Sequence, residues 1–262
     1  MTVDSIVARL GQRAACTPRV RVEEQVDSTN TRLKELAAAG APEGTALIAL
    51  EQTAGRGTHG RAFASPRGEG LYLSMVLRPR GSLAQLFTLT GWAAVAARRA
   101  VMGCCAAPVD IKWMNDLYLN GRKLCGILTE LAPITPDGRA EWAVVGIGIN
   151  LAQSRERFRA LGLEDIATSL AAEGYPVAGE ELAARLIGEL DRLRRDFPHG
   201  GEPYLAQYRQ ACLNLGRRVS FEEGGRTVTG VVREIGDDFS LEVEGEDGVG
   251  RTVTAGTVQL IR

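Results

Sequence analysis

Continuous apolar runs along the chain predict buried strands. They occupy residues 46–50, 71–77 and 142–150, and each is long enough for a strand but short for a helix. The third run is thinned by Gly146 and Gly148, which is consistent with the close approach of a ligand to the backbone. The sequence therefore predicts three strands, of which the first and the third are buried.

Apolar residues three and four positions apart predict four helices. Ser82 and Gln85 form a capping-box pattern that opens the longest helix, which we expect to end at Gly103. Asp27-Ser28-Thr29-Asn30 begins another helix, closed by Gly40, and offers hydroxyl and N–H groups at a positive helix end. Capping alone would explain any one of these residues. The other two helices are expected at residues 182–197 and 205–212.

A hairpin is predicted between residues 111–119 and 122–128, because Asn120-Gly121 between two strand-like runs favours a type I′ turn. Period-2 alternation along the returning strand places Lys123 and Cys125 on one face. We therefore expect Cys125 to lie near any ligand that Lys123 contacts. The alternative for Cys125 is a buried, inert thiol.

The two ends of the chain differ from its middle. Residues 1–22 are short and mixed, and they predict a solvated segment or an edge helix. From about residue 214 short strands alternate with glycine-containing turns, which predicts a small SH3-like β-barrel over residues 214–262. We expect an α+β domain with a mixed sheet and packed helices over residues 23–213.

Composition excludes several classes of protein. The chain has 262 residues, of which 45% are hydrophobic and 24% charged, as is typical of a globular protein. A net charge of −1 and a pI near 6.2 argue against a nucleic-acid binder that relies on bulk electrostatics. No apolar run approaches about 18 residues and no signal-peptide pattern occurs, so we expect no membrane partner and a cytoplasmic protein. The five cysteines lack the spacing of a disulfide framework or a zinc site.

A glycine-rich basic stretch at residues 52–61 follows the first predicted strand. Gly55 and Gly57 let the backbone approach a ligand, and Arg56 and Arg61 suit phosphate or carboxylate. The letters match G-x-G-x-x-G, but a strand rather than a helix follows, which disfavours the dinucleotide fingerprint. We expect a mobile loop that orders around an anion. An ordinary surface loop is the alternative.

The predicted hairpin adds Lys112, Lys123 and one carboxylate, Asp116, to the two arginines of the loop. This set suits the joining of a carboxylate to a nucleotide. Two anions about 4 Å apart repel by roughly 4 kcal/mol at an effective dielectric near 20, so such a site needs several cations and Mg²⁺. Asp116 could hold the metal, since Mg²⁺ usually takes one or two carboxylates besides phosphate oxygens. A surface-exposed charged hairpin is the alternative.

Five motifs occur in order along residues 23–151. They are Asp27-Ser28-Thr29-Asn30; Gln52-Thr53-Ala54-Gly55-Arg56-Gly57-x-x-Gly60-Arg61; Lys112-Trp113-x-Asn115-Asp116; Arg122-Lys123-x-x-Gly126-Ile127-Leu128; and Gly146-x-Gly148-x-Asn150. Together they resemble a biotin protein ligase. The resemblance implies the biotin–lipoate ligase fold, which is like that of class II synthetases, and the β-rich C-terminus is similar to the last domain of that family.

The resemblance also implies a two-step reaction. Biotin and MgATP give biotinyl-5′-AMP and pyrophosphate, and the intermediate then acylates a lysine of the biotin carboxyl carrier domain of acetyl-CoA carboxylase. Arg56 and the loop N–H groups would hold the carboxylate and phosphate, and Lys123 would stabilise charge at the mixed anhydride. Asp116 would serve Mg²⁺ or the attacking lysine.

Ligand contacts follow from the same resemblance. Phe63 replaces the usual Trp and would pack on adenine, and Asn150 would shape the floor of the site. The polar ureido ring would meet Ser28, Thr29, Asn30 and Gln52. The remaining ligand-binding positions implied by the motifs are Gly55, Gly57, Thr58, Arg61, Lys112, Asn115 and Gly126.

Two positions depart from the family pattern. Met114 replaces a Pro, a local change that we expect to be tolerated, and Thr58 replaces the second loop Arg, so we expect biotinyl-5′-AMP to escape faster. Residues 1–22 are too short for the winged helix of the repressor members, which again predicts no DNA partner. A lipoate- or octanoate-transferring enzyme and a non-catalytic regulator are the alternatives, and a homodimer is left open.

Overall fold

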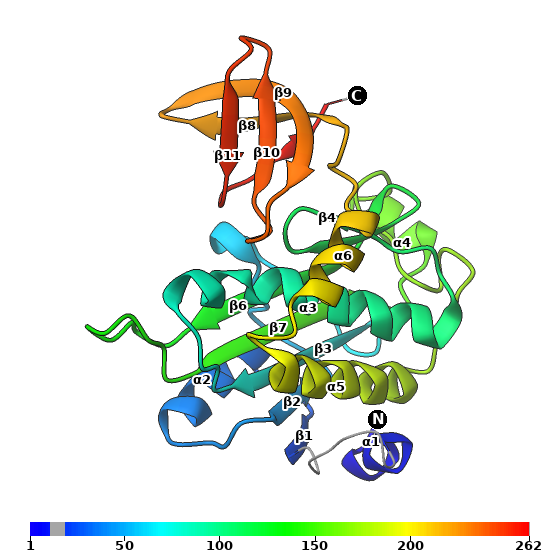
Figure 1. The fold of residues 1–262 in the computed structure, drawn as a ribbon. Helices are drawn as coiled ribbons and strands as arrows, with labels where there is room; N and C mark the ends of the chain where they lie inside the picture. Colours follow the sequence, from blue (N-terminus) through cyan, green and yellow to red (C-terminus); the bar gives the residue numbers. More distant parts are fainter. Residues whose placement is uncertain (11–18, 262) are drawn as a thin grey trace.

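The structure, a computed structural model, describes residues 1–10 and 19–261. A seven-stranded mixed sheet packed with helices forms the larger part, and a five-stranded antiparallel sheet lies at one end of it (Figure 1). The predicted α+β class is confirmed. Within the described residues no helix is long and apolar enough to cross a membrane.

The larger sheet has the strand order β1-β2-β3-β7-β6-β5-β4. β1 runs parallel to β2, and every other neighbouring pair is antiparallel. The three predicted apolar runs are adjacent strands, β2, β3 and β7, whose residues are almost all buried. The bounds are β1 (Arg19–Glu23), β2 (Thr45–Ala49), β3 (Gly70–Leu77), β4 (Asp110–Lys112), β5 (Asp116–Leu119), β6 (Arg122–Leu131) and β7 (Ala143–Asn150).

Helices α3 and α5 lie together over one face of this sheet (Figure 1). The predicted capping box is present, since the Gln85 N–H donates to Ser82 Oγ and the Ser82 N–H donates to Gln85 Oε1. The helix ends at Cys105 rather than at Gly103, because Ala106 takes the left-handed conformation and closes it. The bounds are α1 (Val3–Leu10), α2 (Thr29–Ala38), α3 (Leu83–Cys105), α4 (Arg155–Ala160), α5 (Gly179–Asp196) and α6 (Glu202–Ala211).

Turns and the N-terminal helix agree with the sequence. Asn120 and Gly121 both have positive φ, at 50° and 77°, as the predicted turn requires. Ile6 and Leu10 of α1 are buried, and α1 packs against α5 as an edge helix. The loop at Thr58–Gly60 forms a single 3₁₀ turn.

A β-bulge in the β5–β6 hairpin changes which side chains share a face. Asp116 pairs with Gly126, but Tyr118 pairs with Lys123, so β6 has one residue more than β5 between these pairs. The extra residue places Lys123 on the face of Asp116 and Gly126 and turns Cys125 to the other face. Cys125 is fully buried. The prediction that Lys123 and Cys125 share a face is therefore wrong.

The C-terminal strands form a sheet of order β11-β10-β9-β8-β12. The described C-terminal residues thus form the small β-domain expected at this end of the chain, as a five-stranded antiparallel sheet whose edge strands β11 and β12 are not paired with each other. The bounds are β8 (Arg218–Glu223), β9 (Arg226–Ile235), β10 (Leu241–Gly245), β11 (Gly250–Val253) and β12 (Gln259–Leu260).

The C-terminal sheet docks on the segment between β4 and β5. The Trp113 indole N–H donates to Phe239 O at 2.7 Å, and the Trp113 backbone N–H donates to Asn214 Oδ1 at 2.8 Å. The peptide bond between Trp113 and Met114 is cis, and Met114 O accepts from the Tyr208 hydroxyl. These contacts join the two parts of the molecule beside the predicted site.

Candidate active site

Glycines of β6 and β7 form a bare floor on one face of the larger sheet. Gly126 pairs with Gly148, and Gly146 pairs with Ser74 on the next strand. A Cβ atom on Gly148 would lie 2.6 Å from the Phe63 ring, and one on Gly146 would overlap the amide of Asn30. The two glycines of the predicted G-x-G-x-N motif are thus required by close packing against loop and helix side chains.

A network of hydrogen bonds connects the first polar motif to this floor. Gln52 Oε1 accepts from the backbone N–H of Thr29 at 2.8 Å and from its hydroxyl at 3.1 Å. Ser74 Oγ lies 2.7 Å from both Thr29 Oγ1 and Asn30 Oδ1. Since Asn30 Oδ1 can only accept, the Ser74 hydroxyl donates to it. The Ser28 side chain makes no capping bond, so the helix-start residues serve this network rather than the helix.

Glu130 ends the network and brings three donors together. Its carboxylate accepts from Asn30 Nδ2 at 2.9 Å and from Lys34 Nζ at 2.6 Å, and Arg56 Nη1 lies 3.1 Å away. Burial raises the pKa of Glu130, but the hydrogen bonds from Lys34 and Asn30 and the charges of Lys34 and Arg56 outweigh burial and leave the pKa below its usual value. Glu130 is therefore ionised near neutral pH.

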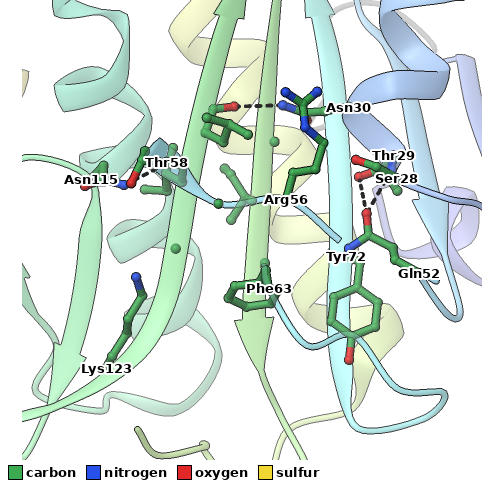
Figure 2. Close-up of a pocket in the computed structure, with 17 residues that line it drawn as sticks. Ser28, Thr29, Asn30, Gln52, Arg56, Thr58, Phe63, Tyr72, Asn115 and Lys123 are labelled. Atoms are coloured by element: carbon green, nitrogen blue, oxygen red, sulfur yellow. Dashed lines mark hydrogen bonds between the residues drawn. The ribbon is translucent and has the colours of Figure 1, made fainter. Parts of the chain in front are cut away.

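A first cavity of about 50 Å³ opens between this network and the glycine floor. Figure 2 shows Arg56 beside Asn30 along its wall, and Gln52 hydrogen-bonded to the Thr29 segment. Phe63 covers Gly148 and meets Tyr72 edge to face at 6.4 Å between ring centroids. The polar lining of the first cavity combines hydroxyl and amide groups with the cations Arg56 and Lys123.

A second, larger cavity of about 430 Å³ adjoins the first. Its cations are Arg61, Lys112 and Lys123, and Asp116 is the only carboxylate among the described residues that line it. The sheet register explains this grouping, because Lys112 pairs with Asp116 and both lie on the face that carries Lys123. With Lys34, these are the three lysines of the chain, and all three lie at the site.

Charges in the second cavity are incompletely balanced. Lys123 Nζ lies 2.7 Å from Asp116 Oδ1, a buried oxygen that has no other partner. Burial, with the neighbouring Lys123 and Arg61, lowers the pKa of Lys112 despite the attraction of Asp116. A bound polyanion would supply the missing negative charge. No group of three or more His, Cys, Asp or Glu suited to a metal occurs in the described part of the chain, so a Mg²⁺ ion here would need ligand oxygens besides Asp116.

The glycine-rich loop separates and borders both cavities. Arg56 contacts Glu130 on one side, and Arg61 Nη2 donates to Thr257 Oγ1 of the C-terminal part at 3.0 Å on the other. Thr58, between them, lines both cavities. A Cβ atom on Gly55 would collide with Phe63 O and Ser65 Oγ, which explains the glycine at that position.

The structure brings most of the predicted residues together. Gly55 lies in the loop behind the lining, and Asn150 lies outside both cavities, where its Nδ2 donates to Thr168 O and its Oδ1 accepts from Gln153. Gly146 and Gly148 supply the floor that was expected of Asn150. Lining one or both cavities are Ser28, Thr29, Asn30, Gln52, Arg56, Gly57, Thr58, Arg61, Phe63, Lys112, Asn115, Asp116, Lys123 and Gly126.

Sequence reasoning missed four residues of the site. Tyr72 and Ser74 lie within an apolar strand and belong to no motif. Because they are two positions apart, strand periodicity could have placed both polar groups on the same face of that strand. Glu130 and Lys34 were not singled out, because they are 96 residues apart in sequence and neither belongs to a motif. Lys34 follows Asn30 by four residues on α2, so the helix period could have placed both on one face.

Comparisons with known proteins agree with this geometry. Residues 22–150 match the biotin/lipoate A/B protein ligase family. The biotin–[acetyl-CoA-carboxylase] ligase of Mycobacterium tuberculosis is 35% identical over 253 residues, which cover 92% of this chain and 88% of that protein. The chain belongs to the biotin/lipoate A/B protein ligase family. Its recognition from five ordered motifs is thereby confirmed.

Solved structures of biotin protein ligases share this family fold. The Aquifex aeolicus enzyme in complex with biotin and ATP has a TM-score of 0.77 and 27% identity, and the match covers 93% of this chain and 99% of that one. The Leishmania major enzyme in complex with biotinyl-5-AMP has a TM-score of 0.61 and 25% identity, with coverage of 92% and 100%. The C-terminal sheet therefore belongs to the fold that these ligases share.

Proposed function

We propose that the chain is an ATP-dependent biotin protein ligase, which activates biotin as biotinyl-5′-AMP and transfers it to a lysine of a biotin carboxyl carrier domain. The observation that carries the proposal is that two cavities of different chemistry share one wall. Lys123, Asn115 and Thr58 line both. A reaction that joins a small acid to a nucleotide needs such a junction, because the reacting atoms must meet in a defined geometry.

Biotin would occupy the first cavity. Its ureido ring would replace or extend the hydrogen bonds of Ser28, Thr29 and Gln52, and a ligand without these polar atoms would leave buried groups unpaired. Of the two cations that line this cavity, Arg56 and Lys123, Arg56 would take the carboxylate. Relatives and solved structures that carry biotin in their names support this assignment.

ATP would occupy the second cavity, with its phosphates toward Lys112, Lys123 and Arg61. Asp116 and the phosphate oxygens would hold Mg²⁺, which when bound neutralises phosphate charge. The fit rests on the buried Asp116 Oδ1, whose one partner is Lys123. ATP and biotin are both present in the Aquifex aeolicus structure of the same fold.

The chemistry would proceed in two displacements. A carboxylate oxygen of biotin attacks the α-phosphorus of ATP, the bond to the bridging oxygen breaks, and pyrophosphate leaves with the electron pair. Negative charge grows where Lys123 lies, so its ammonium stabilises the transition state. The carrier lysine amine then attacks the acyl carbon, an amide forms, and AMP leaves. The amine loses a proton, which Asp116, the one carboxylate among the described residues that line the second cavity, would accept.

Mass spectrometry of a carrier domain tests the proposal. After incubation with enzyme, biotin and MgATP, we expect one biotinyl adduct on the carrier and release of AMP and pyrophosphate. Reactions without ATP, or with a carrier whose target lysine is Arg, should give none. Lipoate or octanoate offered in place of biotin tests the other acids of the family. An adduct with these acids and none with biotin would overturn the proposal.

A further inference from the structure

Glu130 lies beside Arg56, the cation to which we assign the biotin carboxylate, although none of the five motifs includes Glu130. Gly126, Leu128 and Glu130 alternate along β6, so all three face the first cavity or its mouth. Asn30 and Lys34 lie one turn apart on α2 and reach Glu130 from the other side. Glu130 is therefore the anion on the cavity side of this strand.

The Glu130 carboxylate already has the partners that a bound acid would use. Arg56 Nη1 lies 3.1 Å from Oε1 and 3.4 Å from Oε2, and Lys34 Nζ lies 2.6 Å from Oε1. The Glu130 side chain is 18% exposed and that of Arg56 is 45% exposed, so this pair sits at the cavity mouth. Consequently the cation that we assign to the biotin carboxylate is held in this structure by a carboxylate of the protein.

We propose that Glu130 is a positioning residue that holds Arg56 until an acid binds and then yields it to the carboxylate of that acid. This inference rests on the proposed function. Binding of the acid is then an exchange of one carboxylate for another at Arg56. Glu130 weakens the binding of acids relative to neutral analogues, and in return keeps the arginine side chain ordered and aimed at the cavity.

Lys34 makes the exchange workable. When Arg56 turns to the substrate, Glu130 keeps its contacts with Lys34 and Asn30, so it is not left as an unpaired buried charge. Removal of Lys34 leaves Arg56 as the one remaining cation of this cluster, and Glu130 then holds Arg56 more tightly. Substitutions at Glu130 and at Lys34 should thus shift the preference for acids in opposite directions.

Calorimetric titration with biotin and with its neutral primary amide, without ATP, measures that preference as the ratio of the amide Kd to the acid Kd. In Glu130→Gln we expect the ratio to rise roughly fivefold, the size expected for a partly exposed ion pair. In Lys34→Met it should fall about twofold to threefold. Glu189→Gln makes the same chemical change at a side chain of similar exposure, 21%, outside the site, and should leave the ratio unchanged.

A double variant separates the exchange from a merely structural role. In Arg56→Gln the preference for the acid should be small, and adding Glu130→Gln should no longer change it. Equal weakening of acid and amide by Glu130→Gln, or a ratio that falls, would overturn the inference. Absence of binding of either ligand to the unsubstituted protein would instead overturn the proposed function. If Glu130→Gln does not fold, the ratio of the amide Kd to the acid Kd in Lys34→Met tests the inference, and a ratio that stays unchanged or rises would overturn it.

Discussion

The two adjoining cavities are built in different ways. In the first, Gln52, Thr29, Ser74 and Asn30 satisfy one another's hydrogen bonds before any ligand is present. In the second, three cations face a single carboxylate, and burial lowers the pKa of Lys112. The first cavity recognises a neutral polar ring with preset groups, whereas the second is electrostatically incomplete until a polyanion binds.

The different construction of the two cavities predicts whether a substitution should reduce stability and binding or mainly catalysis. Loss of a group from the paired network removes both a binding contact and structural stability, because its partners stay buried and unpaired. Loss of a cation from the charged cavity should affect catalysis more than stability, because the remaining cations still attract the Asp116 carboxylate.

Lys123→Met should have the largest effect. Without its ammonium at the junction, we expect biotin-dependent pyrophosphate release to fall about 10²- to 10³-fold, the typical effect of losing one preorganised group that stabilises transition-state charge. Initial rates under saturating biotin and ATP measure this. Arg139→Met, an exposed cation on the β6–β7 turn, is the matched control and should keep its rate. A rate for Lys123→Met within a few-fold of the parent would remove Lys123 from the mechanism.

Thr58→Arg, at the border of the two cavities, should slow the dissociation of the biotinyl-5′-AMP intermediate. A new charge-assisted hydrogen bond is worth roughly 1.5–3 kcal/mol, which corresponds to about tenfold to hundredfold slower dissociation of biotinyl-5′-AMP. Arg61 is hydrogen-bonded to Thr257, and we assign Arg56 to the biotin carboxylate, which limits the ability of either to replace it. Rapid-mixing dissociation, with stray biotin on a bystander protein as second readout, measures the effect. Unchanged values in both would show that the loop is already compensated.

Ser74→Ala should damage the first cavity and spare the second. It strips the donor from buried Asn30 Oδ1, at a cost of roughly 1–3 kcal/mol in the free energy of unfolding. We expect a lower Tm and about tenfold weaker biotin binding, with nucleotide binding preserved. Thr129→Val is the control, because the Thr129 hydroxyl is buried without a hydrogen-bond partner. Equal loss of biotin and nucleotide binding would contradict the division between the cavities.

Treatment with an alkylating reagent should have the smallest effect, and it should have it at Cys125, which we had expected to lie near the ligand. Cys125 is fully buried, and burial raises the pKa of its thiol, so little thiolate is available between pH 7 and 9. Mass mapping after iodoacetamide treatment should find Cys125 unmodified in the folded protein. Cys104 and Cys105 are partly exposed and serve as internal references, although burial raises the pKa of Cys104 to about 11. Modification of Cys125 that biotin and ATP prevent would show instead that the thiol is accessible and lies near the ligand.

Elements with a local cause were predicted well from the sequence. The apolar runs gave β2, β3 and β7, Asn120-Gly121 gave the hairpin turn, and Ser82 with Gln85 gave the start of α3. Each depends on residues a few positions apart. The five ordered motifs likewise predicted most of the polar lining residues, because these residues are concentrated in short stretches of the sequence.

Features that depend on pairing between distant segments were not predicted. The bulge that separates Lys123 from Cys125 is a property of how β5 and β6 align, and simple alternation cannot reveal it. Glu130 takes its importance from Lys34 and Arg56, which lie on a helix and a loop far earlier in the chain.

Because all three lysines lie at the site, the rest of the proposed enzyme offers few amines that its own adenylate could acylate. Acyl adenylates react with amines. Lys123 and Lys34 form ion pairs with Asp116 and Glu130, and Lys112 is half-buried. Every other basic side chain in the chain is an arginine or one of two histidines, and a guanidinium stays protonated and is a poor nucleophile. An adenylate that escapes past Thr58 would therefore find few side-chain amines on the protein that made it. It would label neighbouring proteins before the enzyme labelled itself.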